Sequence, residues 1–140
     1  MKRLFFDDVR EKPSEGWILA RDVEAAQELM KQNDFDIMSL DHDIGYQMAC
    51  KDCFAEVKSI QEALEKVRIG CPHFPSGTDL AKWMVKNLTV WPKIIIIHSA
   101  NMYGAERMKQ IILDHIQVPI LILPYDKIVL ETIQSTLVIL

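Results

Sequence analysis

Ionisable and hydroxyl side chains follow three short apolar runs of the chain, at the point where each run ends. After residues 4–6, 37–40 and 94–97 come, respectively, Asp7 and Asp8; Asp41, His42 and Asp43; and His98 and Ser99. Carboxylates that converge repel each other unless a cation neutralises them, and carboxylate oxygens select Mg²⁺, Mn²⁺ or Ca²⁺ over zinc or copper. Such a cation can hold and polarise a phosphate, and two imidazoles beside it suit proton transfer near neutral pH. The pattern therefore indicates a metal and phosphate site.

Strands alternate with helices in the elements that must position these residues. Apolar runs predict strands at residues 4–6, 17–20, 37–40, 94–97 and 120–123, and helical spacing predicts helices at 23–30, 78–88 and 105–116. Alternation of this kind is typical of an α/β protein, in which a parallel sheet is covered by helices on both faces. Ligands of such sheets bind outside the carboxyl ends of the strands, where the polar residues lie.

Residues 46–75 contain an insertion that is too long for a simple connection between a strand and a helix. Within it, an apolar stripe over residues 51–68 predicts an amphipathic helix that packs on the domain. The paired spacing of three cysteines and one histidine on either side of this helix fits a structural Zn²⁺, and three free thiols are the alternative. The ligands of this ion would be Cys50, Cys53, Cys71 and His73.

Composition and charge exclude several classes of protein. The 140 residues are 49% hydrophobic and carry 16 Lys and Arg against 20 Asp and Glu, a net charge of −4. Such a chain is not disordered and fits one domain over residues 1–140, with no attraction to a membrane or to duplex DNA. Three cysteines and the absence of a signal peptide indicate the cytoplasm. The apolar residues 137–140 must be buried, either on their own domain or in a homodimer.

Several longer runs carry a resemblance to a known family. They are residues 6–10, 15–17, 39–45, 76–79 with Trp83, and 98–101 with Arg107 and Met108. The acidic pair, Asp41 and Ser99 match the receiver domains of response regulators, in which an acidic pair binds Mg²⁺, a lone Asp accepts a phosphoryl group and a Ser or Thr contacts it. The whole set more closely resembles a divergent branch, the cyclic-phosphate processing receiver domains of bacteria and phages.

The resemblance implies a receiver-like (flavodoxin-like) three-layer αβα fold with a five-stranded parallel sheet and an insertion after the third strand. It also implies a Mg²⁺- or Mn²⁺-dependent phosphoesterase that acts on a cyclic phosphate of a small ligand or an RNA end. In this hypothesis Asp8 and Asp41 bind the metal, Asp7 orients its waters, and His42 or His98 moves the proton. The full metal set is Asp7, Asp8, Asp41 and Asp43, the catalytic set is Asp41, His42, His98 and Ser99, and the phosphate-binding set is Ser99, Asn101, Arg10 and Thr78.

Three alternatives stay open, and Asp41 itself can be nucleophile, phosphoacceptor or only a metal ligand. The chain can be a stand-alone signalling receiver that is phosphorylated on Asp41, although residues 123–127 read Leu-Pro-Tyr-Asp-Lys instead of the usual Lys-Pro pair. Residues 40–43 also resemble the Asp-x-Asp motif of haloacid dehalogenase phosphatases, but that motif normally lies near the N-terminus. An interaction protein that kept the fold without turnover is the third alternative. Residues 9–15, which contain Pro13, are too short for the usual first helix of a receiver.

Overall fold

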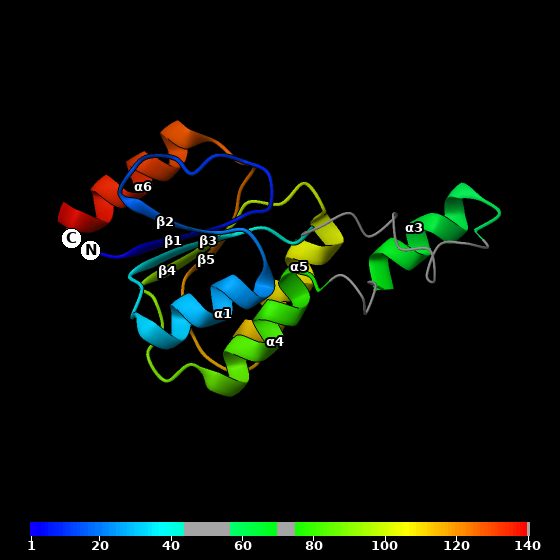
Figure 1. The fold of residues 1–140 in the computed structure, drawn as a ribbon, viewed down its shortest axis with the longest axis horizontal. Coiled ribbons are helices and arrows are strands. Elements are labelled where there is room, and N and C mark those ends of the chain that lie inside the picture. The colour runs from blue at the N-terminus through cyan, green and yellow to red at the C-terminus, as the bar shows by residue number, and fades with distance from the viewer. Residues whose placement is uncertain (44–56, 70–74, 140) are drawn as a thin grey trace.

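The computed structural model describes residues 1–43, 57–69 and 75–139. Its centre is a parallel sheet in the order β2-β1-β3-β4-β5 (Figure 1). The strands are β1 (Arg3–Phe6), β2 (Trp17–Ala20), β3 (Ile37–Leu40), β4 (Ile94–Ile97) and β5 (Ile120–Ile122). The predicted five-stranded parallel sheet is therefore confirmed.

The register of the sheet brings the carboxyl ends of the three central strands to one level. Phe6 of β1 pairs with Leu40 of β3, and Leu40 pairs with Ile97 of β4. The hydrogen-bond ladder continues for one more residue, because the backbone N–H of Asp41 donates to Phe6 and that of His98 donates to Leu40. Residues that directly follow these strands are thus held by the sheet itself and not by mobile loops.

Helices cover both faces of the sheet. Three of them, α1 (Val23–Gln32), α4 (Gly77–Asn87) and α5 (Met102–Leu113), lie on one face, and α6 (Lys127–Ile139) lies on the other (Figure 1). The predicted three-layer arrangement is confirmed, and α6 is an element that the sequence pattern did not predict. As expected, no helix joins β1 to β2: the connection over residues 7–16 is a loop on the α6 side of the sheet.

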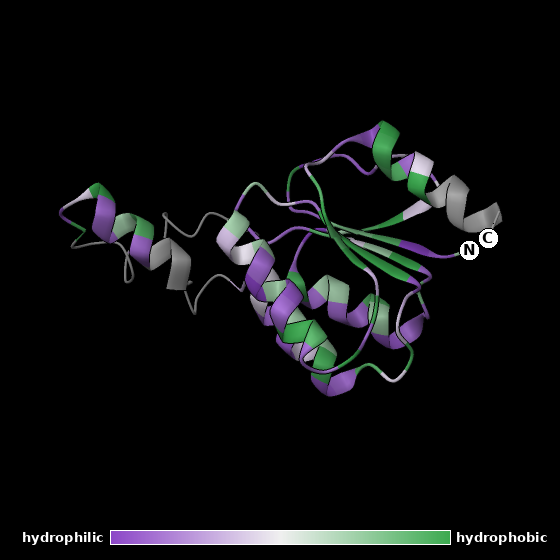
Figure 2. Ribbon diagram, turned by 180° about the vertical axis from the view of Figure 1, so that it is seen from behind, coloured by the Kyte–Doolittle hydropathy of each residue, from purple (hydrophilic) through white to green (hydrophobic). Residues whose placement is uncertain are grey.

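Two apolar clusters hold these layers together, one on each side of the sheet. Alternation along β4 sends Ile95 and Ile97 into the cluster under α1, α4 and α5, and Ile94 and Ile96 into the cluster under α6. All four isoleucines are buried, as predicted for a strand covered on both faces. Leu130 of α6 is also buried in the second cluster. Figure 2 shows the apolar strands between the helices, and hydrophilic residues alternate with hydrophobic ones along α1, α4 and α5.

The insertion after β3 differs from the prediction in the part that is described. Its helix, α3 (Ile60–Ile69), lies apart from the sheet (Figures 1 and 2). The predicted helix over residues 51–68 was wrong at residues 57–59, because Ser59 caps a helix that begins after it by accepting from the N–H of Glu62. The expectation that the stripe packs on the domain was also wrong for Ile60 and Leu64, which are 79% and 63% exposed.

Several predictions concern residues outside the described ranges. These are the insertion over residues 46–56 and 70–74, including the zinc ligands Cys50, Cys53, Cys71 and His73. Leu140 is also outside, and a homodimer through the apolar C-terminus stays a prediction. Of the helices in the described ranges, none has the length and apolar character that a membrane crossing requires.

Candidate functional site

Three buried ionisable side chains meet at the carboxyl edge of the sheet. Asp7, Asp41 and His98 directly follow β1, β3 and β4, and one potential ligand atom of each lies within 4.8 Å of the others. Arg10, from the loop after β1, extends its guanidinium to two of them. We call Asp7, Arg10, Asp41 and His98 the carboxylate centre.

Asp7 is completely enclosed, and every hydrogen bond it accepts favours its ionised form. Its Oδ1 accepts from the backbone N–H groups of Val9 and Arg10 at 3.0 and 2.9 Å. Its Oδ2 accepts from His98 Nε2 at 2.9 Å and from Arg10 Nη1 at 3.0 Å. Burial alone would raise the pKa of Asp7, but these hydrogen bonds, with that of His98 first, hold it well below its usual range. Asp7 is therefore a permanently charged member of the centre.

Asp41 lies beside Asp7, but its surroundings shift its pKa in the opposite direction. Its Oδ1 accepts from the backbone N–H of His42 at 2.8 Å, and its Oδ2 lies 3.5 Å from Arg10 Nη1. Burial, and then the negative charge of Asp7, raise the pKa of Asp41 to about 6. The centre is thus short of positive charge at Asp41, and this carboxylate gains most from an added cation.

Arg10 supplies the positive charge that the centre already has. Its side chain is 35% exposed, and Nη1 lies between the Oδ2 atoms of Asp7 and Asp41. Burial lowers the pKa of Arg10, but the hydrogen bond with Asp7 and the charges of the neighbouring carboxylates raise it overall. The guanidinium carbon also lies 5.6 Å from the centre of the Tyr125 ring. One guanidinium therefore serves two carboxylates and reaches the surface beside a tyrosine.

His98 is fixed from all sides. Its Nδ1 lies 2.7 Å from Ser39 Oγ, its Nε2 donates to Asp7, and its ring is stacked on Phe5 with the centroids 4.7 Å apart. The side chains of His98 and Asp7 are both 0% exposed. Ser39 was missed by the sequence reasoning, although a single hydroxyl residue in the otherwise apolar strand Ile-Met-Ser-Leu was a signal that it has a buried partner.

A second group of polar side chains lies on the α4 and α5 side of the same edge. His42 Nδ1 lies 2.7 Å from Asp43 Oδ1, and His42 Nε2 lies 2.9 Å from Thr78 Oγ1. Asn101 donates from Nδ2 to the same Asp43 oxygen at 3.1 Å. The hydrogen bond from His42, and then that from Asn101, lower the pKa of Asp43, although burial opposes them. We call His42, Asp43, Thr78 and Asn101 the His42 group.

Two glycines allow helices to pack directly on the loop that carries Asp41 and His42. A Cβ atom on Gly77, the first residue of α4, would lie 2.4 Å from the carbonyl oxygen of Asp41. One on Gly104, in the first turn of α5, would lie 2.3 Å from the His42 ring. The N–H of Gly77 also donates to the carbonyl of His42 at 2.8 Å. Close approach of backbone to this loop therefore requires glycine at both positions.

The structure distributes the predicted site residues unequally. Asp8 is partly exposed and lies outside the group formed by Asp7, Asp41 and His98. Ser99 is buried, and its Oγ accepts from the N–H of Asn101 at 3.1 Å. Lys127, the nearest equivalent of the receiver lysine, forms an ion pair with Glu11 at 3.5 Å. The roles of Asp8 and Asp43 as metal ligands stay predictions.

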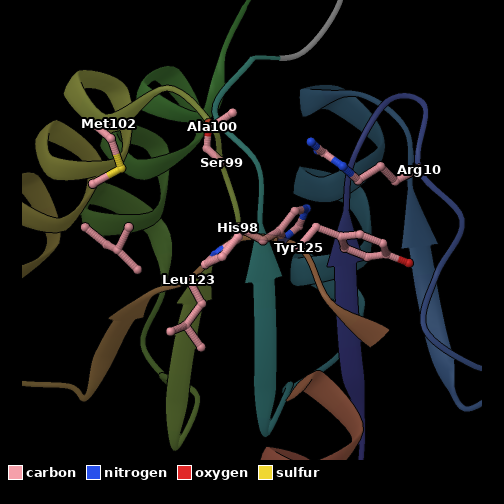
Figure 3. A pocket seen from close by; sticks show the side chains of 9 residues that line it. Arg10, His98, Ser99, Ala100, Met102, Leu123 and Tyr125 are labelled. Carbon is pink, nitrogen blue, oxygen red and sulfur yellow. The ribbon is translucent and has the colours of Figure 1, made fainter. Parts of the chain in front are cut away.

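A cavity of about 500 Å³ opens beside the carboxylate centre (Figure 3). Its polar residues are Arg10 and His98 of the carboxylate centre and Ser99, which follows His98. Its apolar residues come from α5 and from the segment after β5. Among them are Met102, Leu123 and Tyr125.

The donor atoms of the carboxylate centre fit a hard divalent cation. Carboxylate oxygens of Asp7 and Asp41 approach each other closely enough to share one ion, and Mg²⁺ prefers oxygen ligands. The Arg10 guanidinium between them already occupies the place of a positive charge. His98 is better suited to orient Asp7 than to bind the ion, because its Nε2 is committed to the Asp7 carboxylate.

Comparison with known families agrees with this geometry. The model of the family described as cyclic-phosphate processing receiver domain matches residues 2–114. No curated protein matches the chain by sequence. The matched range includes all strands up to β4, both groups at the carboxyl edge and the insertion. The chain therefore belongs to the family of cyclic-phosphate processing receiver domains.

Proposed function

We propose that the protein is a Mg²⁺- or Mn²⁺-dependent phosphoesterase that opens a cyclic phosphate on a nucleotide or an RNA end. The carboxylate centre carries this proposal: a pair of buried carboxylates that needs positive charge lies at the ligand-binding edge of a family described as cyclic-phosphate processing. In the reaction, water adds to phosphorus, one ring P–O bond breaks, and the leaving oxygen takes up a proton. A bound divalent cation would supply the positive charge that polarises the phosphate.

Arg10 and Ser99 are the residues that we assign to the phosphate oxygens. Both line the cavity beside the centre, and both carry donors within reach of a ligand there. Asp7 and Asp41 would hold the cation, whose charge would neutralise the carboxylates that Arg10 now contacts. The Arg10 guanidinium could then bind the phosphate through two parallel hydrogen bonds.

His42 is the residue that we assign to proton transfer. A general acid must recover its proton from solvent in every cycle, and the hydrogen-bonded partner of His42, Asp43, has a side chain that is 51% exposed. His98 is less suited to this task, because both of its hydrogen-bond partners, Ser39 and Asp7, are 0% exposed. Thr78 and Asn101 then fix the His42 and Asp43 side chains, and their contact with phosphate stays a prediction.

Phosphorus NMR on a 2′,3′-cyclic nucleotide tests the proposal. With Mg²⁺, the protein should convert the cyclic phosphate into a monoester, and chelation with EDTA should stop the conversion. Asp41→Asn should abolish it, whereas the matched change Asp34→Asn, at an exposed position away from the site, should leave it unchanged. No conversion of any cyclic phosphate, together with a stable phosphoryl group on Asp41 after incubation with acetyl phosphate, would instead support a signalling receiver.

A further inference from the structure

We infer that the cavity beside the carboxylate centre is a nucleobase site, so that the substrate is recognised as a nucleotide and not only as a cyclic phosphate. This inference rests on the proposed function for the position of the phosphate. It adds the part of the ligand that determines specificity, and it concerns Met102, Leu123 and Tyr125, to which the proposed reaction gives no role.

The cavity and the carboxylate centre share residues, and this determines what can occupy the cavity. Arg10 and His98 belong to both, and Ser99 continues the chain from His98 into the cavity wall. A group attached to a phosphate at the centre would therefore lie in this cavity. The volume, about 500 Å³, is within the range of ~300–1,000 Å³ that is usual for small-molecule sites.

The walls of the cavity have two kinds of surface. Met102 at the start of α5 and Leu123 after β5 present apolar side chains, and Tyr125 adds an aromatic ring (Figure 3). Ser99 and Arg10 also line the cavity, and the Arg10 guanidinium lies on the same side as the Tyr125 ring (Figure 3). Because Arg10 and Ser99 are assigned to the phosphate, the lining left for the rest of the ligand is the apolar and aromatic surface of Met102, Leu123 and Tyr125. A bare sugar would leave this surface exposed to water.

A planar heterocycle that is attached to the phosphate suits this surface. Its faces can pack against Leu123, Met102 and the tyrosine ring. Stacking of a base on an aromatic side chain is sequence-tolerant, because every base has a π face. Cations such as guanidinium also favour such faces. The lining therefore suits a nucleobase without specifying which one.

Equilibrium binding of three probes to the His42→Gln variant with Mg²⁺ present tests the inference, because this variant keeps the carboxylate centre and should not turn the ligands over. The probes are a 2′,3′-cyclic nucleotide, the 2′,3′-cyclic phosphate of a methyl riboside, which lacks a base, and the matching nucleoside, which lacks a phosphate. The cyclic nucleotide should bind about ten-fold more tightly than the baseless ester, which is the gain in affinity expected from stacking of one base on an aromatic side chain. Equal affinity for these two probes would overturn the inference and leave the proposed function intact.

Variants of the apolar wall give a second readout. Leu123→Ala and Met102→Ala should each weaken binding of the cyclic nucleotide several-fold and leave the baseless ester unaffected, whereas the matched change Leu121→Ala, on the same stretch of chain but outside the cavity lining, should affect neither. Met102 is 56% exposed, so its variant tests the site even if Leu123→Ala fails to fold. Equal weakening of both esters would overturn the base site.

The nucleoside separates failure of the inference from failure of the proposed function. If it binds as tightly as the cyclic nucleotide, the base site stands and the phosphate site fails. If none of the three probes binds, both are overturned.

Discussion

His98 and His42 are both buried and both use two ring nitrogens, but they differ in how exposed their hydrogen-bond partners are. The His98 ring lies between Ser39 and Asp7, whose side chains have no contact with solvent. The His42 ring lies between Thr78, which is almost buried, and Asp43, whose side chain is half-exposed. One histidine is thus part of the sheet's interior, and the other is one hydrogen bond from water.

Because their partners differ in exposure, we assign the two histidines separate tasks. His98 is a positioning residue, because it holds the Asp7 carboxylate and fixes the charge of the carboxylate centre. His42 is linked to solvent and to two helix N-termini, which is what a residue that exchanges protons requires.

Replacement of His42 should affect turnover more than any other property. Under the proposed function, His42→Gln removes the general acid, and loss of such a group typically costs ~10²–10⁴-fold in rate. The affinity for Mg²⁺ should change little, since His42 lies outside the carboxylate centre. Rates from phosphorus NMR and Mg²⁺ titrations of the same variant check this, and a wild-type rate would remove His42 from the reaction.

Replacement of His98 should instead affect stability. His98→Gln removes one charge-stabilising hydrogen bond from the buried Asp7 and disrupts that of the buried Ser39, and we expect the free energy of unfolding to fall by about 3 kcal/mol. Urea denaturation at pH 7 measures this change. The matched control is His115→Gln, at an exposed position, which should stay within about 0.5 kcal/mol of wild type. A loss no greater than that of the control would mean that His98 does not hold the centre together.

The two carboxylates of the centre should respond to pH in opposite directions. Because the pKa of Asp41 is raised to about 6 in the folded state, that state binds more protons than the unfolded chain between about pH 4 and 6. The contribution of Asp41 to the free energy of unfolding therefore falls as the pH rises from about 4 to 6. Above about pH 6 the ionised Asp41 destabilises the folded state by its full amount. Asp41→Asn should raise the free energy of unfolding by ~1–3 kcal/mol at pH 7, and this gain should disappear as the pH falls to about 4.

Asp7→Asn supplies the opposite case. The depressed pKa of Asp7 means that its contribution to stability is complete above the unfolded pKa and is lost only as the pH falls below about 4. Asp7→Asn should thus lower stability at pH 7, and the loss should become smaller in acid. Thermal melting of both variants from pH 3 to 8 tests the pair, and parallel curves would contradict the division between the two carboxylates.

A smaller effect is expected where α5 packs on the His42 group. The added Cβ of Gly104→Ala would meet the His42 ring, and overpacking of this kind costs ~1–3 kcal/mol, which the better helix propensity of alanine partly offsets. Gly16→Ala is the matched control, since its Cβ meets only the end of the flexible Arg3 side chain. Chemical denaturation should therefore show a net loss of about 1 kcal/mol for Gly104→Ala only, and equal values for the two variants would contradict the close packing.

Much of the fold followed from local patterns in the sequence. The predicted strands at residues 17–20, 37–40 and 94–97 coincide with β2, β3 and β4, because each is a short apolar run that ends in a polar residue. Helix α6 was missed because its residues are apolar without a clear helical stripe, so periodicity did not separate it from a buried extended tail. The predicted range of helix α3 included residues 57–59, which precede the helix. A stripe of apolar residues does not show at which serine cap a helix begins.

The sequence predicted which residues form the candidate site, but not how they separate into the carboxylate centre and the His42 group. Position after a strand identified Asp7, Asp41 and His98, since a parallel sheet aligns its carboxyl ends. It could not show that Arg10 bridges two carboxylates, because that contact depends on how the loop after β1 folds back. Nor could it show that Asp43 joins His42, because neighbouring side chains in a loop take directions that only tertiary packing decides.

Calorimetric titration of Mg²⁺ into the protein at pH 7 shows which group of side chains binds the cation. We expect Asp7 and Asp41 of the carboxylate centre, and not the His42 group, to hold it. Asp41→Asn should therefore remove Mg²⁺ binding, whereas Asp43→Asn should keep it within a few-fold of wild type. Unchanged binding by Asp41→Asn, or loss of binding only in Asp43→Asn, would contradict the account.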